Sequence, residues 1–218
     1  MRKIAIIGAG GFGREVKMLI DNINEKSHQF DIIGFFDDKH FDKPINGIPY
    51  LGKIEEINKV DYPLSIAVAI GDPTTKKLII QSIQNNNIEY PNLIHPSVII
   101  GKDEVQFGKG NIICAGVIIT VNIKINDFII LNLSCTVGHD TEIGSFSSFM
   151  PTVNISGEVN IKEGVYVGTG AKIINLLEIG ENTIIGAGAV VSKSLPSNCT
   201  AVGIPAKPIK FHNKVDEE

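Results

Sequence analysis

The chain has 218 residues, with 20 basic and 24 acidic side chains and a formal net charge of −4. This length allows one large domain or two small ones. Because the net charge is negative and no basic cluster occurs, the composition gives no electrostatic support for nucleic-acid binding. No apolar run approaches the ~18 residues of a membrane-spanning helix. In the amino-terminal sequence MRKIAIIGAG, glycines interrupt the apolar stretch too early for the apolar region of a signal peptide.

The chain has three cysteines, Cys114, Cys135 and Cys199. Their number is odd and their spacing matches no common zinc motif. We therefore expect buried thiols in the reducing environment of the cytoplasm, because structural disulfides are rare there.

The first predicted strand, Lys3–Ile7, runs directly into a glycine-rich turn. Gly8, Gly10 and Gly13 match the G-x-G-x-x-G pattern of nucleotide-binding turns. The following segment has apolar residues at helical spacing, at Val16, Leu19, Ile20 and Ile23. In this context the backbone N–H groups and the helix N-terminus can hold a phosphate or diphosphate. The pattern therefore predicts a nucleotide-binding turn.

Two further apolar runs predict strands in this region. The first covers residues 32–36 and is followed by Asp37 and Asp38. The second covers residues 64–70 and is followed by Gly71-Asp72. A helical pattern then follows through Leu78, Ile79 and Ile83, and a last short strand is expected over residues 87–93. Strand, glycine turn, helix and strand in this order are typical of a doubly wound parallel sheet.

Residues 1–94 are thus predicted to form an α/β, Rossmann-like half domain. About 90 residues are too few for a complete dinucleotide domain, which argues against a nicotinamide-dependent oxidoreductase. Asp37 and Asp38 lie where acids can bind the ribose or base of a nucleotide. They could also be turn residues that end a strand.

The second half of the chain has a strict period of six residues. Every sixth position is Phe, Ile, Leu or Val, at Phe107, Ile113, Ile119, Ile125, Leu131, Val137, Ile143, Phe149, Ile155, Ile161, Val167, Ile173, Ile179, Ile185 and Val191. Neither an α-helix nor an ordinary strand has this period. It is typical of stacked triangular coils, in which each short strand sends one anchor side chain inward. We expect a parallel β-helix over residues 95–218, with a frayed charged end at residues 215–218.

The neighbours of the anchors support this interpretation. The residue after an anchor is often small or turn-forming, as at Gly108, Asn126 and Gly138. Because glycine and asparagine tolerate a positive φ, we expect the left-handed corner residue at this position. The residue two before an anchor is usually small or β-branched, as at Val117 and Cys135, and should also face inward.

His139 is the only histidine within the repeats, and Asp140 follows it. His139 comes two residues after an anchor, so it should lie at a corner outside the core. An imidazole can accept a proton at neutral pH, and an adjacent carboxylate can orient it and raise its basicity. The alternative is an ordinary surface histidine. A zinc site of the γ-carbonic-anhydrase type would need three histidines from the coils, so we expect no metal.

Several segments together resemble a known family: GAGGFGREV, FFDDK, AVAIGD, LIHPSVIIG, TVGHDTEIG, VGTGAK, GAGAVV and VGIPAKPI. They are similar to the left-handed β-helix acyltransferases that N-acetylate nucleotide-linked amino-sugars, often labelled sialic-acid O-acetyltransferase-like. The resemblance extends over almost the whole chain. It implies a left-handed β-helix, acetyl-CoA as co-substrate and a UDP-, dTDP- or GDP-linked amino-sugar as acceptor. It also implies a homotrimer with coenzyme A in the clefts between subunits, and a role in glycan biosynthesis.

The resemblance also implies roles for individual residues. His139 would be the general base, Asp140 the acid that tunes it, and Gly157 the backbone N–H donor to the thioester carbonyl. The implied coenzyme A contacts are Ser148, Thr169 and Ala187. The implied nucleotide-sugar contacts are Gly10, Gly11, Phe12, Asp37, Asp38, Gly71 and Thr74.

The chain departs from the family pattern at three of these positions. Phe12 stands where many members have histidine, and Ser148 stands where some have a second histidine. Asp140 stands where the family often has glutamate. The first two differences leave the identity of the acceptor open more than the type of reaction.

Two other functions remain as alternatives. An O-acetyltransferase acting on a free sugar or sialic acid would give the nucleotide-type domain no phosphate to hold. A non-catalytic scaffold that binds nucleotide-sugars would not need the His139-Asp140 pair. For the enzyme we expect direct transfer without a covalent intermediate, because no cysteine lies beside a base in the sequence.

Overall fold

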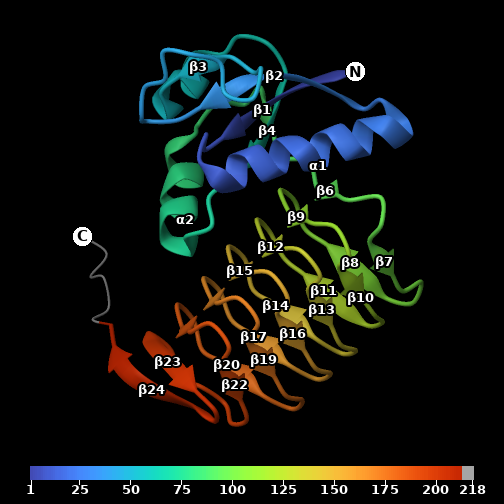
Figure 1. Ribbon diagram of the computed structural model, residues 1–218, viewed down its shortest axis with the longest axis vertical. Coiled ribbons are helices and arrows are strands. Elements are labelled where there is room, and N and C mark those ends of the chain that lie inside the picture. The colour runs from blue at the N-terminus through green and yellow to red at the C-terminus, as the bar shows by residue number, and fades with distance from the viewer. Residues whose placement is uncertain (213–218) are drawn as a thin grey trace. The chain divides into compact units, whose positions relative to one another are not determined.

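The computed structural model describes residues 1–212 (Figure 1). The prediction for residues 215–218 lies outside these described residues. The chain divides into two compact units: Met1–Pro96 with Lys109–Ile112 forms the first, and Ser97–Gly108 with the chain from Ile113 onwards forms the second. Among residues 1–212, no helix is both long enough and apolar enough to cross a membrane.

The amino-terminal unit is built on a parallel five-stranded sheet with the order β3-β2-β1-β4-β5. Its elements in chain order are β1 (Arg2–Ile7), α1 (Gly11–Ser27), β2 (Phe30–Phe36), β3 (Tyr50–Gly52), the 3-10 helix η1 (Ile54–Lys59), β4 (Leu64–Val68), α2 (Pro73–Ser82) and β5 (Ile88–Glu89). Strand β1 pairs with β2 on one side and with β4 on the other. Its residues 4–7 are completely buried, as expected for a central parallel strand.

The glycine turn connects β1 to α1, as predicted. Gly8 has φ +95°, a conformation that other residues rarely adopt. A Cβ on Gly13 would overlap the carbonyl oxygen of Gly8, so glycine permits the close packing of helix against turn. The turn follows the carboxyl end of β1, and Gly71 lies beyond that of β4. The strand order reverses between β1 and β4, since β2 and β3 lie on one side of β1 and β4 and β5 on the other. In open α/β sheets, ligands bind at such a point, beyond the carboxyl ends of the strands.

A helix is present where the pattern through Leu78 and Ile79 predicts one, but its apolar residues do not form its buried face: Leu78 is 61% exposed, whereas Lys76 is 1% exposed. The prediction of a single last strand over residues 87–93 is wrong. The predicted last strand is two separate strands, β5 and β6 (Leu93–Ile94), which belong to different sheets. Pro91 lies between them and cannot donate a backbone hydrogen bond to a ladder.

From β6 onwards the chain forms a parallel β-helix, visible in Figure 1 as a stack of coils from green to red. A six-stranded sheet contains β7 (Ile99–Ile100), β10 (Ile118–Ile119), β13 (Thr136–Val137), β16 (Asn154–Ile155), β19 (Lys172–Ile173) and β22 (Val190–Val191). A five-stranded sheet contains β8 (Val105–Phe107), β11 (Ile123–Ile125), β14 (Glu142–Ile143), β17 (Asn160–Ile161) and β20 (Glu178–Ile179). An eight-stranded sheet contains β6, β9 (Ile112–Ile113), β12 (Ile130–Leu131), β15 (Ser148–Phe149), β18 (Tyr166–Val167), β21 (Ile184–Ile185), β23 (Cys199–Gly203) and β24 (Ala206–Phe211). Strands of successive coils pair in parallel, as β10 does with β13, β11 with β14 and β12 with β15, whereas β23 and β24 form an antiparallel hairpin.

The anchors form the core of the β-helix. Every anchor from Ile113 to Val191 is buried, while Phe107 near its start is half-buried. The inward position two residues before the anchor is confirmed as well, for example at Val117 and Cys135, both completely buried. The period of six therefore predicted both the coils and their interior.

The predicted position of the left-handed corner residue is wrong by two residues. Positive φ values occur three residues after the anchor, as at Asn122 (φ 55°), Asp140 (φ 56°) and Glu158 (φ 58°), and not one residue after it. The residue after the anchor is often glycine for another reason, because the next coil leaves no space for a side chain at this position. A Cβ on Gly138 would lie 2.5 Å from the carbonyl carbon of Ser156 in the next coil.

We expect Phe149→Ala to destabilise the β-helix by about 3–5 kcal/mol, the usual cost of emptying a buried aromatic site. The Phe149 side chain has no exposed surface. Urea unfolding followed by circular dichroism measures the change. Phe211→Ala is the control, because the Phe211 side chain is 64% exposed. Similar unfolding midpoints for the two variants would contradict the anchor role of Phe149.

Candidate active site

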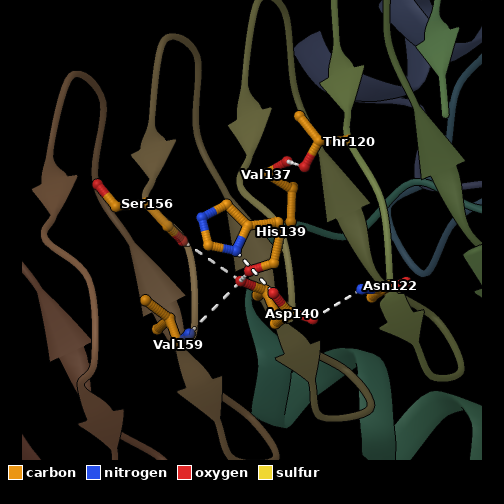
Figure 2. A network of polar contacts seen from close by, with 8 residues as sticks. Thr120, Asn122, Val137, His139, Asp140, Ser156 and Val159 are labelled. Carbon is orange, nitrogen blue, oxygen red and sulfur yellow. Dashed lines mark hydrogen bonds and ion pairs between the residues drawn. The ribbon is translucent and has the colours of Figure 1, made fainter.

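Three successive coils contribute to one corner of the β-helix, between the six-stranded and five-stranded sheets (Figure 2). Asn122 follows β10, the pair His139 and Asp140 follows β13, and Gly157 follows β16. One full coil takes 18 residues, which is the separation of Asn122 from Asp140. Parallel stacking therefore places these residues one above the other.

The side chains of His139 and Asp140 are in direct contact. His139 Nδ1 lies 2.7 Å from Asp140 Oδ2, and the two side chains are 55% and 48% exposed. An ionised carboxylate only accepts hydrogen bonds, so Nδ1 is the protonated nitrogen facing it. In the neutral imidazole, Nε2 is then the nitrogen that can accept a proton.

Asp140 is held by a second side chain as well. Its other oxygen, Oδ1, accepts a hydrogen bond of 2.9 Å from Asn122 Nδ2. The hydrogen bond from Asn122, followed by the one from His139, lowers the pKa of Asp140 below its ordinary value. The carboxylate is therefore ionised at neutral pH and can stabilise a protonated imidazole.

Gly157 lies directly against the imidazole ring. A Cβ at this position would overlap His139 Nε2 and lie 2.5 Å from Cε1. The Gly157 carbonyl accepts a hydrogen bond from Leu176 N–H, but within residues 1–212 its own N–H has no acceptor. The corner thus places a proton-accepting nitrogen beside a buried glycine whose N–H has no acceptor within residues 1–212.

The backbone of His139 is fixed by the next coil. Its carbonyl oxygen accepts a hydrogen bond of 2.7 Å from Glu158 N–H. The buried hydroxyl of Thr141 lies 3.4 Å from the same carbonyl oxygen and 3.3 Å from the carbonyl oxygen of Ser156. The main chain that carries the imidazole is therefore anchored from two directions.

A polar hollow of about 380 Å³ borders Asp140 on the side of the five-stranded sheet. It is lined by Glu104, Gln106, Asn122, Ile123, Lys124, Asp140, Thr141 and Glu142. Lys124 Nζ lies 2.7 Å from Glu142 Oε1, so the cation of this hollow is paired with Glu142.

The three residues implied as coenzyme A contacts lie elsewhere on the prism. Thr169 and Ala187 are exposed and follow β18 and β21, at the corner between the eight-stranded and six-stranded sheets. Ser148 lies in β15 of the eight-stranded sheet and is completely buried. A single chain therefore does not bring Thr169 or Ala187 to the corner that carries His139.

The implied nucleotide-sugar residues are in the amino-terminal unit. Gly10 and Gly11 are exposed where α1 begins, and Phe12 in its first turn is half-buried. Asp37 Oδ2 accepts a hydrogen bond of 2.7 Å from the backbone N–H of Ala9. Asp37 therefore also has a structural role, because it holds the glycine turn.

Asp38, Gly71 and Thr74 complete this group. Asp38 borders a hollow of about 550 Å³, lined by Asp38, Lys53, Ile54, Glu55, Asn58, Leu78, Ile79 and Ser82. Gly71 directly precedes Asp72, which caps α2 by accepting from Thr75 N–H, and Thr74 is exposed in the first turn. These three residues lie beyond the carboxyl ends of β2 and β4.

The cysteines are buried and unpaired with one another. Burial raises the pKa of Cys135 to about 11, so its thiol is protonated at neutral pH. We expect the folded protein to resist iodoacetamide at pH 7.5, as measured by intact mass, and the urea-unfolded protein to take up three adducts. Rapid labelling of Cys135 in the folded protein would contradict this. Residues 1–212 contain no group of three His, Cys, Asp or Glu side chains placed to bind a metal ion.

Comparison with known proteins gives one family model and full-length relatives. Residues 3–83 match the PglD N-terminal domain. The chain is 32% identical over 217 residues to the GDP-perosamine N-acetyltransferase of Escherichia coli O157:H7, covering 96% of this chain and 97% of the relative.

Solved structures are similar over the same length. PerB from Caulobacter crescentus, in complex with CoA and GDP-perosamine, is 29% identical, with a TM-score of 0.85 and coverage of 96% and 98% of the two chains. The acetyltransferase domain of PglB from Neisseria gonorrhoeae, in complex with acetyl coenzyme A, is 30% identical, with a TM-score of 0.85 and coverage of 95% and 99%.

Proposed function

The chain belongs to the family of hexapeptide-repeat sugar N-acetyltransferases, and we propose that it transfers the acetyl group of acetyl-CoA to the amino group of a nucleotide-linked amino-sugar. It is an acyltransferase with a left-handed β-helix. The observation that carries the proposal is the His139–Asp140 pair, whose Nε2 lies beside Gly157 at an exposed corner.

The geometry supports direct transfer with His139 as general base. His139 Nε2 accepts a proton from the attacking amine as its nitrogen bonds to the thioester carbonyl carbon. The carbon–sulfur bond then breaks, and the thiolate of coenzyme A leaves and takes up the proton from the imidazolium. Asp140 stabilises that imidazolium through Nδ1. Gly157 N–H would donate to the oxygen on which negative charge develops.

In this proposal the amino-terminal residues 1–94 hold the nucleotide portion of the acceptor, and residues 95–218 carry out acyl transfer. The exposed glycines Gly10 and Gly11 at the start of α1 suit a diphosphate, because the helix N-terminus offers N–H groups and a positive dipole. Phe12, Asp38, Gly71 and Thr74 lie around the same end of the sheet.

We further propose that the active enzyme is a homotrimer with the reaction site between subunits. The support is that Thr169 and Ala187 lie on a different corner from His139 and Gly157. The corner with Thr169 in one subunit would face the corner with His139 in the next subunit, and the two together would form one reaction site. The six-stranded sheet between the two corners exposes the apolar side chains of Ile99 and Ile118, which suit burial against a neighbour. A monomer in sedimentation velocity at micromolar concentration would contradict this assembly.

A cytoplasmic location is part of the proposal. It is supported by three cysteines that form no disulfide.

The proposed reaction is tested by thiol release from acetyl-CoA, measured with Ellman's reagent against UDP-, dTDP- and GDP-linked amino-sugars. Free amino-sugars and sialic acid serve as controls. We expect release with one nucleotide-linked amino-sugar and none with the free sugars. Release only with hydroxyl acceptors would make the protein an O-acetyltransferase. Binding of nucleotide-sugars without any release across the panel would support the scaffold alternative and contradict the proposal.

A further inference from the structure

We propose that Asn122 is a positioning residue for the acyl transfer, because its side-chain amide fixes the Asp140 carboxylate that orients the imidazole of His139. This inference rests on the proposed function of the His139–Asp140 pair. It adds a third member, contributed by the preceding coil, to the group that holds the base.

Both oxygens of the carboxylate are engaged. Oδ2 lies 2.7 Å from His139 Nδ1, and Oδ1 lies 2.9 Å from Asn122 Nδ2. A carboxylate with one partner can turn about its last bond, whereas two donors on its two oxygens define its plane. Because an ionised carboxylate offers only acceptors, the amide nitrogen of Asn122 must be the atom that faces it.

Stacking of the coils brings Asn122 to this place. Asn122 and Asp140 occupy the same corner position in consecutive coils, with φ values of 55° and 56°. Their backbones make equivalent hydrogen bonds, Asn122 N–H to Asp103 O and Asp140 N–H to Val121 O. Asparagine adopts the left-handed conformation more readily than most residues, so it suits both the corner and the contact.

The charges along this corner explain why a neutral donor is needed. Glu104 occupies the equivalent position one coil before Asn122, and Glu158 one coil after Asp140. An acid at position 122 would give four acidic side chains in successive coils. The nearby cation Lys124 is paired with Glu142. Within residues 1–212, Asn122 and His139 are the side chains that donate hydrogen bonds to Asp140.

The test compares Asn122→Gly with a matched control, Asn182→Gly. Both asparagines have a positive φ, and Asn182 also donates to a neighbouring coil, to Asn198 Oδ1. Glycine keeps the left-handed backbone in both variants and removes only the side chain. For Asn122→Gly we expect kcat to fall about three- to tenfold, with KM for acetyl-CoA and for the acceptor unchanged. Asn182→Gly should keep the wild-type kcat.

A double-mutant cycle then shows whether Asn122 acts through Asp140. In the Asp140→Ala background, Asn122→Gly should have no further effect on kcat. Unchanged kcat in Asn122→Gly, an equal loss in Asn182→Gly, or multiplicative effects in the cycle would each overturn the inference.

A readout that needs no substrate separates this inference from the proposed function. Carboxyl ¹³C NMR titration should show a higher pKa for Asp140 in Asn122→Gly than in the wild type, since a donor to the ionised form is lost. Asn182→Gly should leave that pKa unchanged. If the pKa of Asp140 does not move in Asn122→Gly, the inference fails, whatever the acceptor panel shows. If the pKa moves but the wild type acetylates no amino-sugar, the proposed function fails, and the positioning role of Asn122 in acyl transfer fails with it.

Discussion

Replacing His139 by alanine should lower kcat about 10²–10⁴-fold, the usual contribution of a general base. The affinity for acetyl-CoA should hardly change, because the imidazole acts on the acceptor amine, whereas the implied coenzyme A contacts are other residues, Thr169 and Ala187 among them. Stopped-flow thiol release gives kcat, and isothermal titration with coenzyme A gives the affinity.

His28→Asn is the matched control for the loss of a histidine. His28 caps the C-terminus of α1 with a positive φ that asparagine tolerates, in the unit that does not carry His139. It should keep wild-type turnover and melting temperature. Full activity of His139→Ala would show that His139 is not the base.

Replacing Gly157 by alanine should lower kcat about 100-fold while leaving the protein at least as stable as the wild type. The added Cβ would occupy the space of the imidazole and force His139 to turn away. A misplacement of about 1 Å in a catalytic group can cost that factor. The backbone at Gly157 has no positive φ, so alanine is not strained there. Loss of glycine can even stabilise the fold, by about 0.4–1 kcal/mol, through the unfolded chain.

Melting temperature and kcat must be measured together for this variant. Ser156→Ala is the control, because it changes the adjacent exposed residue without adding an atom near the ring. Wild-type turnover in Gly157→Ala would mean that the imidazole need not occupy its observed position. If the melting temperature falls together with kcat, the loss of turnover comes from impaired folding and not from displacement of the imidazole.

The architecture of the β-helix could be predicted because one interaction repeats. Every anchor from Ile113 to Val191 meets the same requirement, to fill the interior, so the sequence shows a clean period. The left-handed corner carries no such signal, since residues as different as Asn122, Phe128 and Asp140 occupy it. Parallel stacking of the coils imposes the left-handed backbone conformation at this position, so the type of side chain there does not predict it.

The amino-terminal unit shows a different limit. The glycine turn was predictable because Gly13 must approach the backbone of Gly8 closely. The buried face of α2 was not, because Lys76 is buried and Leu78 exposed, which contradicts their hydrophobicity. Burial of Lys76 lowers its pKa to about 7, an effect that only a packed structure can show.

The residues of the candidate site at the His139 corner were predictable in part. His139 and Asp140 are adjacent in sequence, and the resemblance to the family pointed to Gly157. Asn122 was missed, although its separation of 18 residues from Asp140 is one full coil. Reading the sequence in steps of 18 would have placed Asn122 on the carboxylate. The distribution of Thr169 and His139 over two corners became visible only in three dimensions.

In the proposed reaction the chain forms an amide bond, with His139 as the base. The most direct measurement uses [¹³C]acetyl-CoA and the nucleotide-linked amino-sugar that releases most thiol, with the product examined by NMR. We predict an acetyl carbonyl that correlates with an N–H proton of the sugar in the wild-type reaction and is nearly absent with His139→Ala. An acetyl carbonyl correlated with a sugar C–H through an ester oxygen would make the reaction an O-acetylation, and an amide formed equally well by His139→Ala would rule out His139 as the base.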